Sequence, residues 1–369
     1  MHRTLAQAGK EFAQFRRDRL TVTLSVVMPL VMNLLFGLAL SLDPDGLRLM
    51  VIDHDQTPAS RRYVDAFVAS GKFDLLWPES RTDPERVLST GTAEAVLIVP
   101  PFFERELLAG RAPETQALID GTDANTALVV RQQAQAVHYS FLLSSLPAAA
   151  RTSPIEADVR FFYNPGLSDR RYFGTGALGM VLIFFPALLG AAASSREIEL
   201  GTVIQPFAST LSSLEWTIGK AFPYILIGIG ELVLCLCLGA FVFEYRLPPD
   251  PTAFFAASVF YIAVGVLFGM LVGYQTGTQA AAIQFVLIVV FLLSLLLSGF
   301  LTPIENIPAA LRWASALIPA RYYIWTVRDG LLRGGGWQAA WPQVASLAAL
   351  ALALFASNVV RMRRMQFRD

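Results

Sequence analysis

Charged residues are scarce in this sequence, and cysteine is scarcer still. Only 16% of the 369 residues are Asp, Glu, Lys or Arg, against about 25% in soluble globular proteins. The only cysteines, Cys235 and Cys237, lie together in an apolar run, which argues against a disulfide scaffold or a cysteine metal cluster. Acidic and basic residues balance at 29 each, so no excess of positive charge points to nucleic acid as a partner.

Motifs for nucleotide, metal and hydrolytic chemistry are missing as well. There is no G-x-x-x-x-G-K-[ST] phosphate loop, so we expect the chain to bind no ATP and no cofactor of its own. Asp53, His54, Asp55 and His138 have no zinc or calcium spacing, and turn chemistry explains the aspartates equally well. No serine between residues 42 and 172 lies in a G-x-S-x-G elbow, so we expect neither a metal site nor a catalytic residue there.

Apolar residues are what the sequence has in excess. They make up 54% of the chain, and the mean hydropathy is +0.50. Crossing a bilayer takes about 20 apolar residues, and in lipid such a run must be helical unless it closes a barrel. Six runs qualify, at 21–41, 173–195, 218–243, 252–274, 279–301 and 341–360. The fold class we predict is a polytopic α-helical membrane protein with six transmembrane helices and an inserted α/β domain.

The charges are distributed very unevenly. Between Asp43 and Arg171 lie 18 acidic and 13 basic residues, which indicates one polar domain at 42–172. Basic residues cluster in the first 20 residues and again in the tail at 361–369. Basic flanks face the cytoplasm, and an even number of spans puts both ends on one side. We therefore expect both termini to be cytoplasmic and the 42–172 domain to be periplasmic or extracellular.

The N-terminal region allows more than one interpretation. Leu5, Ala8, Phe12 and Phe15 recur at helical spacing in residues 1–20, which predicts an amphipathic helix on the inner membrane surface, with a frayed tail as the alternative. Ala39-Leu40-Ser41 has the small-x-small pattern of a signal-peptidase site. Against cleavage, the apolar run at 21–41 is too long for a typical signal peptide.

The polar domain alternates strand-like and helix-like stretches. The strand-like stretches are 47–53, 73–78, 95–100, 115–119 and 157–163, and the helix-like ones are 60–70, 83–88, 102–108 and 123–144. Pro101 and Asp123 are plausible helix N-terminal signals. This alternation predicts a small α/β domain between the first and second spans.

Three motif blocks resemble the ABC-2 type permeases, the membrane subunits of one class of ATP-binding-cassette exporter. The first is S-R-E-I-E-L-G-T at 195–202, followed by L-E-W at 214–216 and G-K-A-F-P-Y at 219–224. The second is S-G-F-L-T-P-I-E-N-I-P at 298–308, followed by I-P-A-R-Y-Y at 318–323 and R-D-G at 328–330. The third is F-F-Y-N-P at 161–165. The order of parts also matches the family over nearly the whole chain.

The resemblance implies an ATPase on a separate subunit, which uses ATP and Mg. The cytoplasmic loop 196–216 would couple to it through Arg196, Glu197, Glu199, Gly201 and Thr202, with the two glutamates as charged contacts and Gly201 allowing close backbone approach. An ordinary polar loop is the alternative. Pro206 departs from the family pattern and breaks a helix interior at a cost of about 3 kcal/mol, so the loop helix must end, kink or restart there.

The resemblance also implies two paired permease subunits, identical or paralogous. The second and fifth spans would line a substrate path for a hydrophobic or amphipathic cargo, with Phe184, Phe185, Phe291, Ser294 and Ser298 on its wall. The segment 302–336 would form a re-entrant pair of short helices on the outer side. A periplasmic adaptor is a further potential partner of the outside domain, and a bacterial inner membrane is the implied location.

Two features within the predicted membrane region stand out without the resemblance. Gly265, Gly269 and Gly273 form overlapping G-x-x-x-G steps, which favour close helix packing over a place in the substrate path. Glu231 is an intramembrane carboxylate and thus a candidate for carrying a proton or meeting a cationic substrate. The alternative is a structural pair with a buried donor such as Gln284.

Two other classes of function fit parts of the sequence. A proton-coupled secondary transporter would use Glu231, but the hydropathy shows no pair of matching multi-span halves. A membrane receptor would use the 42–172 domain as its sensor, but no assigned cytoplasmic segment is long enough for an output module. We therefore predict an ABC exporter permease, driven by a separate ATPase.

Overall fold

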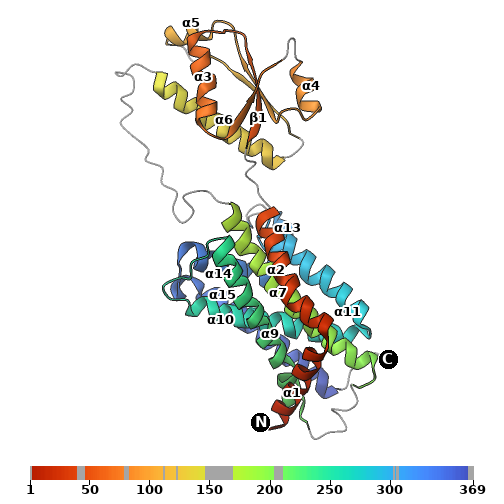
Figure 1. Cartoon of the computed structure of the whole chain (residues 1–369). Coiled ribbons are helices and arrows are strands. Elements are labelled where there is room, and N and C mark those ends of the chain that lie inside the picture. The colour runs from red at the N-terminus through yellow and green to blue at the C-terminus, as the bar shows by residue number, and fades with distance from the viewer. Residues whose placement is uncertain are drawn as a thin grey trace. The chain divides into compact units, whose positions relative to one another are not determined.

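The computed structural model describes residues 2–39, 46–78, 83–110, 113–121, 124–145, 169–202, 211–301, 304 and 307–364. The chain divides into two compact units, one made of residues 41–160 and the other of residues 1–40 together with 161–369 (Figure 1). The predicted strand at 157–163, the F-F-Y-N-P turn, Pro206 and most of the Ala39-Leu40-Ser41 motif lie outside the described residues.

The smaller unit is built on a four-stranded sheet of order β2-β1-β3-β4. Its strands are β1 (Leu47–Asp53), β2 (Phe73–Leu76), β3 (Ala95–Val99) and β4 (Gln116–Ile119). β1 pairs in parallel with β2 and β3, and β4 closes the edge antiparallel to β3. All four strands lie within three residues of the predicted strand-like stretches.

Alternate residues of the strands face two different layers of helices. On one face Leu49 and Val51 pack with Tyr63 and Phe141, which come from α3 (Pro58–Ala69) and α6 (Ala124–Ser145). The same layer includes α5 (Phe103–Leu108). On the other face Met50 packs with Val87 of α4 (Pro84–Ser89). The smaller unit is thus an α/β domain with helices on both faces of its sheet.

Turn chemistry accounts for the aspartates that follow β1. Asp53 Oδ1 accepts hydrogen bonds from the backbone amides of Asp55 and Gln56, and its Oδ2 accepts one from the Ser60 hydroxyl at 2.7 Å. Asp55 Oδ2 accepts hydrogen bonds from the Thr57 hydroxyl at 2.6 Å and from the Glu104 amide at 3.0 Å. No group of three His, Cys, Asp or Glu side chains among the described residues is arranged to hold a metal ion.

The Asp55 carboxylate caps the N-terminus of α5, and this makes the helix sensitive to pH. Burial raises the pKa of Asp55, but hydrogen bonds from Thr57 and from the backbone at Glu104 outweigh burial and hold it below 3.8. A lowered pKa contributes stability that is complete above the ordinary pKa and is lost as the pH falls through the folded-state pKa.

We expect the Asp55→Asn variant to show little of this pH dependence. Wild-type α5 should lose amide protection as the pH falls below about 4, because protonation removes the negative charge at the helix N-terminus. The measurement is hydrogen exchange of the α5 amides, corrected for the intrinsic rate at each pH. An equal loss of protection in wild type and variant over that range would contradict the capping role.

The larger unit is helical and contains the candidate membrane spans. It begins with α1 (His2–Arg17) and α2 (Arg19–Ala39), and continues with α7 (Asp169–Glu199), α9 (Ser213–Val242) and α10 (Thr252–Thr276). α11 (Gln279–Val286), the π-helical η1 (Leu287–Leu292) and α12 (Leu293–Leu297) follow as one rod. Then come α13 (Ala309–Ala316), α14 (Pro319–Arg328), η3 (Asp329–Arg333) and α15 (Trp337–Arg364). Six stretches among the described helices are long and apolar enough to cross a membrane, as predicted.

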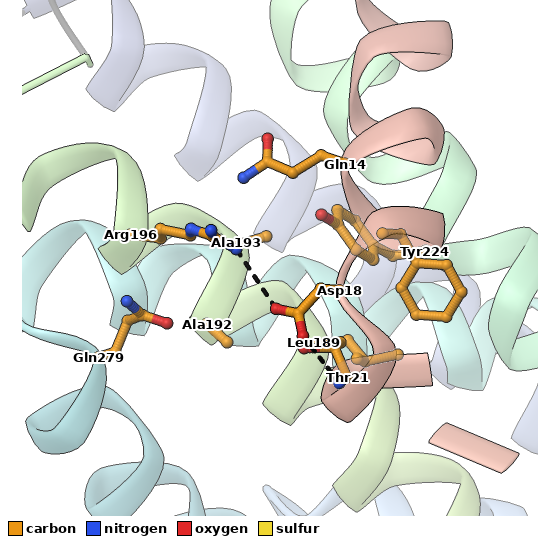
Figure 2. A pocket seen from close by; sticks show the side chains of 10 residues that line it. Gln14, Asp18, Thr21, Leu189, Ala192, Ala193, Arg196, Tyr224 and Gln279 are labelled. Carbon is orange, nitrogen blue, oxygen red and sulfur yellow. Dashed lines mark hydrogen bonds and ion pairs between the residues drawn. The ribbon is translucent and has the colours of Figure 1, made fainter. Parts of the chain in front are cut away.

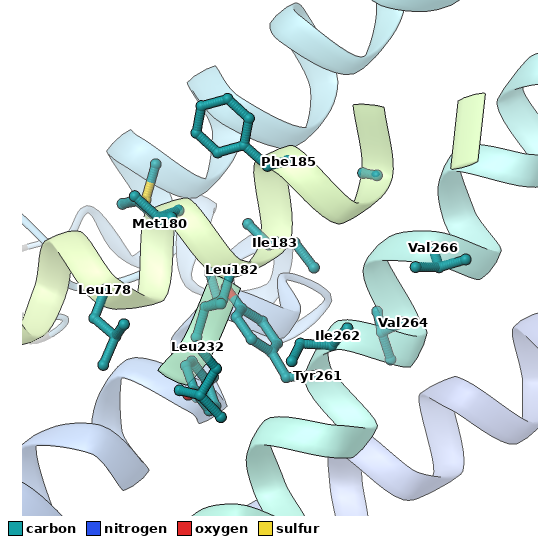
Figure 3. Packing of buried hydrophobic residues seen from close by; sticks show 14 of the residues in the cluster. Leu178, Met180, Leu182, Ile183, Phe185, Leu232, Tyr261, Ile262, Val264 and Val266 are labelled. Atoms are coloured by element: carbon teal, nitrogen blue, oxygen red, sulfur yellow. The ribbon is translucent and has the colours of Figure 1, made fainter. Parts of the chain in front are cut away.

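α7 is the central helix of this unit. Within its spanning stretch 83% of the residues are buried, against 22% in the α11 stretch and 24% in that of α2. It packs against α2, α9, α10, α11 and α14. Figure 3 shows the core around it, with Ile183 of α7 near Val264 and Val266 of α10. The exposed apolar faces of the outer helices are those expected to contact lipid or another subunit.

Three glycines bring α10 close to α7. A Cβ atom built on Gly269 would lie 2.0 Å from the carbonyl oxygen of Ala187, and one on Gly273 would lie 2.5 Å from that of Ala191. One on Gly265 would lie 3.0 Å from the carbonyl oxygen of Ile183. The overlapping G-x-x-x-G steps therefore serve backbone approach between these two helices.

All six spans differ by a few residues from their predicted limits, and two of the differences are notable. α7 continues beyond residue 195 to Glu199, because hydropathy marks where apolar residues stop and not where a helix ends. The fifth span is interrupted by the π-turn η1 and ends at Leu297. In the segment 302–336 the structure has the short helices α13 and α14 and the π-turn η3. Their depth in a membrane stays a prediction.

Candidate functional site

The N-terminal helix α1 is attached to the start of α9 by its polar face. Gln7 and Glu11 are buried, whereas Leu5 and Phe12 on the apolar face are 58% and 50% exposed. A Cβ atom on Gly219 of α9 would lie 3.0 Å from the carbonyl oxygen of Thr4, so a glycine permits this close contact. Of the predicted apolar face, Leu5 and Phe12 are exposed, whereas Phe15 packs against the core of the helical unit. The location of α1 on the inner membrane surface stays a prediction.

The polar face of α1 ends in a buried ion cluster, which consists of Lys10, Glu11, Glu197 and Lys220. Lys220 is fully buried, and its Nζ lies 3.3 Å from Glu11 Oε1 and 2.7 Å from Glu197 Oε2. Lys10 Nζ lies 3.0 Å from Glu197 Oε1. Two cations and two anions balance in charge, so the buried Glu11, Glu197 and Lys220 are compensated by one another and by the partly exposed Lys10.

Neutral side chains complete the surroundings of the ion cluster. Gln7 Nε2 donates to Glu11 Oε1 at 2.9 Å, and the Tyr224 hydroxyl donates to Glu11 Oε2 at 3.0 Å. The Trp216 ring lies 5.4 Å from Lys220 Nζ and 5.7 Å from Lys10 Nζ, which is within cation–π range. The cluster thereby joins α1, the last turns of α7 and the first turns of α9.

A second set of contacts ties the same part of α7 to α2 and α11. Arg196 pairs with Asp18 at 3.4 Å, and Asp18 also accepts a hydrogen bond from the Thr21 amide at the start of α2. Figure 2 shows this pair. Arg196, Asp18 and Gln279 all line a small pocket with a volume of about 40 Å³. Glu199 Oε2 accepts hydrogen bonds from the backbone amide and the side chain of Gln279, so its charge lies at the N-terminus of α11, where an anion is favourable.

The predicted coupling residues thus occupy the end of α7 and the turn after it. Glu197 is only 4% exposed, and in this conformation its carboxylate faces the lysines of its own chain instead of a partner. Gly201 has φ +67° and open space around it. It therefore ends the helix by a left-handed turn, a conformation that favours glycine. Close backbone approach of a partner at Gly201 stays a prediction. The Thr202 hydroxyl donates to the Glu197 carbonyl at 3.3 Å.

Comparison with known proteins shows the family of this chain. The model of the ABC-2 family transporter proteins matches residues 19–360. The chain belongs to the ABC-2 family.

Curated relatives of similar length carry related names. The chain is 24% identical to the probable multidrug ABC transporter permease YbhS of Escherichia coli, over 90% of this chain and 89% of that protein. It is also 24% identical to the probable multidrug ABC transporter permease YbhR of Escherichia coli, over 97% of this chain and 100% of that protein. The inner membrane transport permease YhhJ of the same organism is 25% identical, over 86% of this chain and 85% of that protein.

This ABC-2 chain is therefore a multi-pass membrane protein and the permease subunit of an ABC exporter, and its ATPase is a separate subunit. Membership of the family decides against the secondary-transporter and receptor interpretations of the sequence. It also gives the ion cluster and the α7–α9 connection a context, because energy from the ATPase has to enter the permease through a contact surface.

The predicted substrate-path residues fall into two groups in the ABC-2 chain. The Phe184 ring lies 5.1 Å from that of Phe185 and 5.4 Å from that of Phe291, so three of them meet. Phe36 of α2 joins them at 6.1 Å from Phe291, a neighbour that sequence reasoning missed. Ser294 lies elsewhere, in an apolar cavity between α7, α10 and α15. Ser298 is buried at the end of α12.

Glu231 is buried in α9 without the predicted partner. Gln284 is exposed and does not bond to it, and neither Glu231 carboxyl oxygen has a hydrogen-bond partner among the described residues. The thiol of Cys235, one helical turn along, interacts electrostatically with Glu231 and is also in contact with Asn33 of α2. The structure does not form the pair with Gln284, because Glu231 is buried and Gln284 is exposed.

Proposed function

We propose that this permease exports a hydrophobic or amphipathic substrate across a bacterial inner membrane, and that its ATPase docks at the end that carries α1. The ion cluster is the observation that carries the docking proposal. It fastens α1, the end of α7 and the start of α9 to one another. A push on the turn after α7 would therefore be transmitted to two spans and to α1 together, with no cofactor held by this chain; ATP and Mg belong to the ATPase.

Basic residues support a cytoplasmic location for that end. Arg16 and Arg17 close α1, and Arg361 and Arg363 lie in the last turns of α15. Since basic flanks stay on the cytoplasmic side and the span number is even, the α1 end would face the cytoplasm. The α/β domain, inserted between the first and second spans, would then lie on the periplasmic or extracellular side.

Exposed apolar surface supports pairing with a second permease subunit, identical or paralogous. Phe184, Leu188 and Ala192 are partly exposed positions of the mostly buried α7, at intervals of four residues. α2 and α11 pack against the same helix and are largely exposed themselves. Phe36, Phe184, Phe185 and Phe291 form a phenylalanine group on α2, α7 and η1. A subunit pair joined at this face would place this group next to its counterpart in the second subunit. The apolar passage between them would suit a drug-like or lipid-like cargo, in keeping with the multidrug names of the relatives.

A groove on the α/β domain supports an adaptor as a further partner. It has a volume of about 540 Å³ and is lined by Trp77, Arg61 and Asp65, among others. Trp77 is 61% exposed, and exposed tryptophan beside arginine is typical of binding hot spots. We propose that a periplasmic adaptor protein binds here.

We expect the Leu200→Asp variant to lose its ATPase. Leu200 is 64% exposed directly after α7, and a carboxylate in an apolar contact should weaken association by about 10- to 100-fold. The measurement is co-purification of the ATPase with the tagged permease from membranes, with ATP-driven transport in vesicles as the second readout.

The matched control is Leu108→Asp, the same substitution at an apolar residue that is 82% exposed on the α/β domain. It should leave both the association and the transport unchanged. If the Leu200→Asp protein retains its ATPase at the wild-type ratio, the docking surface lies elsewhere.

A further inference from the structure

The helical unit contains an apolar cavity that lies apart from the group formed by Phe36, Phe184, Phe185 and Phe291. It lies between α7, α10, the η1–α12 segment and α15, and has a volume of about 260 Å³. Ile183 and Val264, which Figure 3 shows on facing helices, form part of its inner wall. Among the described residues of the lining, Ser294 alone has a polar side chain. A wall of this composition suits hydrocarbon and disfavours water.

The wall includes the π-helical turn of the fifth span. Val289 and Val290 of η1 line the cavity, and Leu293 follows them. Phe291, from the same turn, contacts Phe36 and Phe184 instead. π-turns recur at functional sites of helices because they redirect side chains. Here the turn separates a cavity-facing side of the span from the phenylalanine group.

The cavity opens on the outside of the helical unit, between α12 and the start of α14. Two of its lining residues, Leu293 and Leu317, are 37% and 65% exposed. Next to them Leu292 and Leu296 are 43% and 52% exposed. An opening rimmed by exposed leucines on a membrane-spanning rod is accessible from the hydrocarbon of the bilayer.

A cation stands at this opening. Ile318 and Pro319 line the cavity, and Arg321 follows in the first turn of α14. The Arg321 guanidinium donates to the Ser315 hydroxyl at 3.3 Å, and that hydroxyl donates to the Leu297 carbonyl at 2.7 Å. These bonds hold Arg321 beside the end of α12. The N-terminus of α14 adds partial positive charge at the same place.

We propose that this cavity binds one acyl chain of a membrane phospholipid, whose phosphate lies beside Arg321. The apolar lining fits the chain, the opening faces the bilayer, and the arginine and helix terminus fit an anionic headgroup at the mouth. A transported cargo is the less suitable occupant, because the cavity lies on the other side of η1 from the phenylalanine group. The site is thus one for a resident lipid within a single subunit.

The test uses the full chain in vesicles of phosphatidylethanolamine and phosphatidylglycerol. A trace of phosphatidylglycerol carries a photoactivatable diazirine on its acyl chain, and adducts are mapped by peptide mass spectrometry. We expect adducts to concentrate at 289–294, 317–319 and 350–354. Adducts spread evenly over the exposed faces of α2, α9 and α11, as from bulk lipid, would overturn the proposal, and this mapping needs no variant.

Two variants on α15 provide a matched comparison. Leu350 lines the cavity, whereas Leu352 is 67% exposed and does not. Leu350→Trp places a larger side chain in the cavity, with the added volume of about two methylene groups, and should lower the yield of cavity adducts about tenfold. Leu352→Trp should leave that yield unchanged. Equal labelling of the two variants would contradict a bound chain.

The headgroup assignment is tested separately at Arg321. Arg321→Gln should lower cavity labelling by the anionic probe about threefold, and Arg321→Lys should retain it, because one exposed charge pair contributes little more than that. If Arg321→Gln labels as wild type does, the phosphate is not held there and the proposal as stated is wrong.

Discussion

The Lys220→Met variant should lose about 3–5 kcal/mol of stability in the helical unit, because removing one partner of a buried ion pair leaves the other charge uncompensated. Lys220 is fully buried and is the cation shared by Glu11 and Glu197. Methionine retains the volume of the side chain but not its charge. The measurement is thermal and denaturant unfolding of the purified permease in detergent, together with ATP-driven transport by the assembled exporter.

Lys10→Met is the matched control. Lys10 pairs with the same Glu197, but its side chain is 45% exposed, so water screens the interaction and its loss should cost less than about 1 kcal/mol. A loss of the same size in both variants would show that burial does not distinguish the two lysines, and the assignment of Lys220 as the central cation would fail.

A double variant separates charge from packing. Lys220→Met combined with Glu11→Gln leaves Lys10 and Glu197 as one balanced pair. The stability changes caused by substituting two residues in contact do not add, so the double variant should be more stable than Lys220→Met alone. Transport should remain impaired, because α1 then has no ionic link to α9. Transport at the wild-type rate in the double variant would mean that the ionic link between α1 and α9 takes no part in coupling.

Sequence reasoning reached the spans and the α/β elements because their patterns are local. The stretch 47–53 is short, apolar and followed by turn residues, and it forms β1 over the same residues. The apolar runs are as plain, since burial in lipid requires about 20 consecutive apolar residues. Hydropathy does not predict where a helix continues beyond its apolar part, as α7 does to Glu199.

The ion cluster was not predictable, because its partners are far apart in the chain. Lys220 is 209 residues from Glu11 and Glu197 is 187 residues from Lys10. A lysine inside an apolar run signals that a partner exists, but nothing in the spacing names it. For the same reason the sequence does not show that the motif residue Glu197 pairs with Lys10 and Lys220. The π-turn at 287–292 was equally hidden, since its residues are uniformly apolar.

The Gly269→Ala variant should destabilise the α7–α10 pair by about 3 kcal/mol, near the upper end of the usual cost of overpacking. Its methyl group would lie 2.0 Å from the Ala187 carbonyl oxygen, which belongs to the backbone of the central helix and has no rotamer by which to move away. The loss should fall in the order Gly269, Gly273, Gly265, following the clash distances of 2.0, 2.5 and 3.0 Å. Thermal unfolding in detergent measures this loss of stability.

Gly230→Ala in α9 is the control: nothing lies within 4 Å of its Cβ position, so the better helix propensity of alanine should leave stability unchanged or raise it by up to about 1 kcal/mol. If the three α10 variants unfold at the same temperature as Gly230→Ala, the two backbones are not in contact.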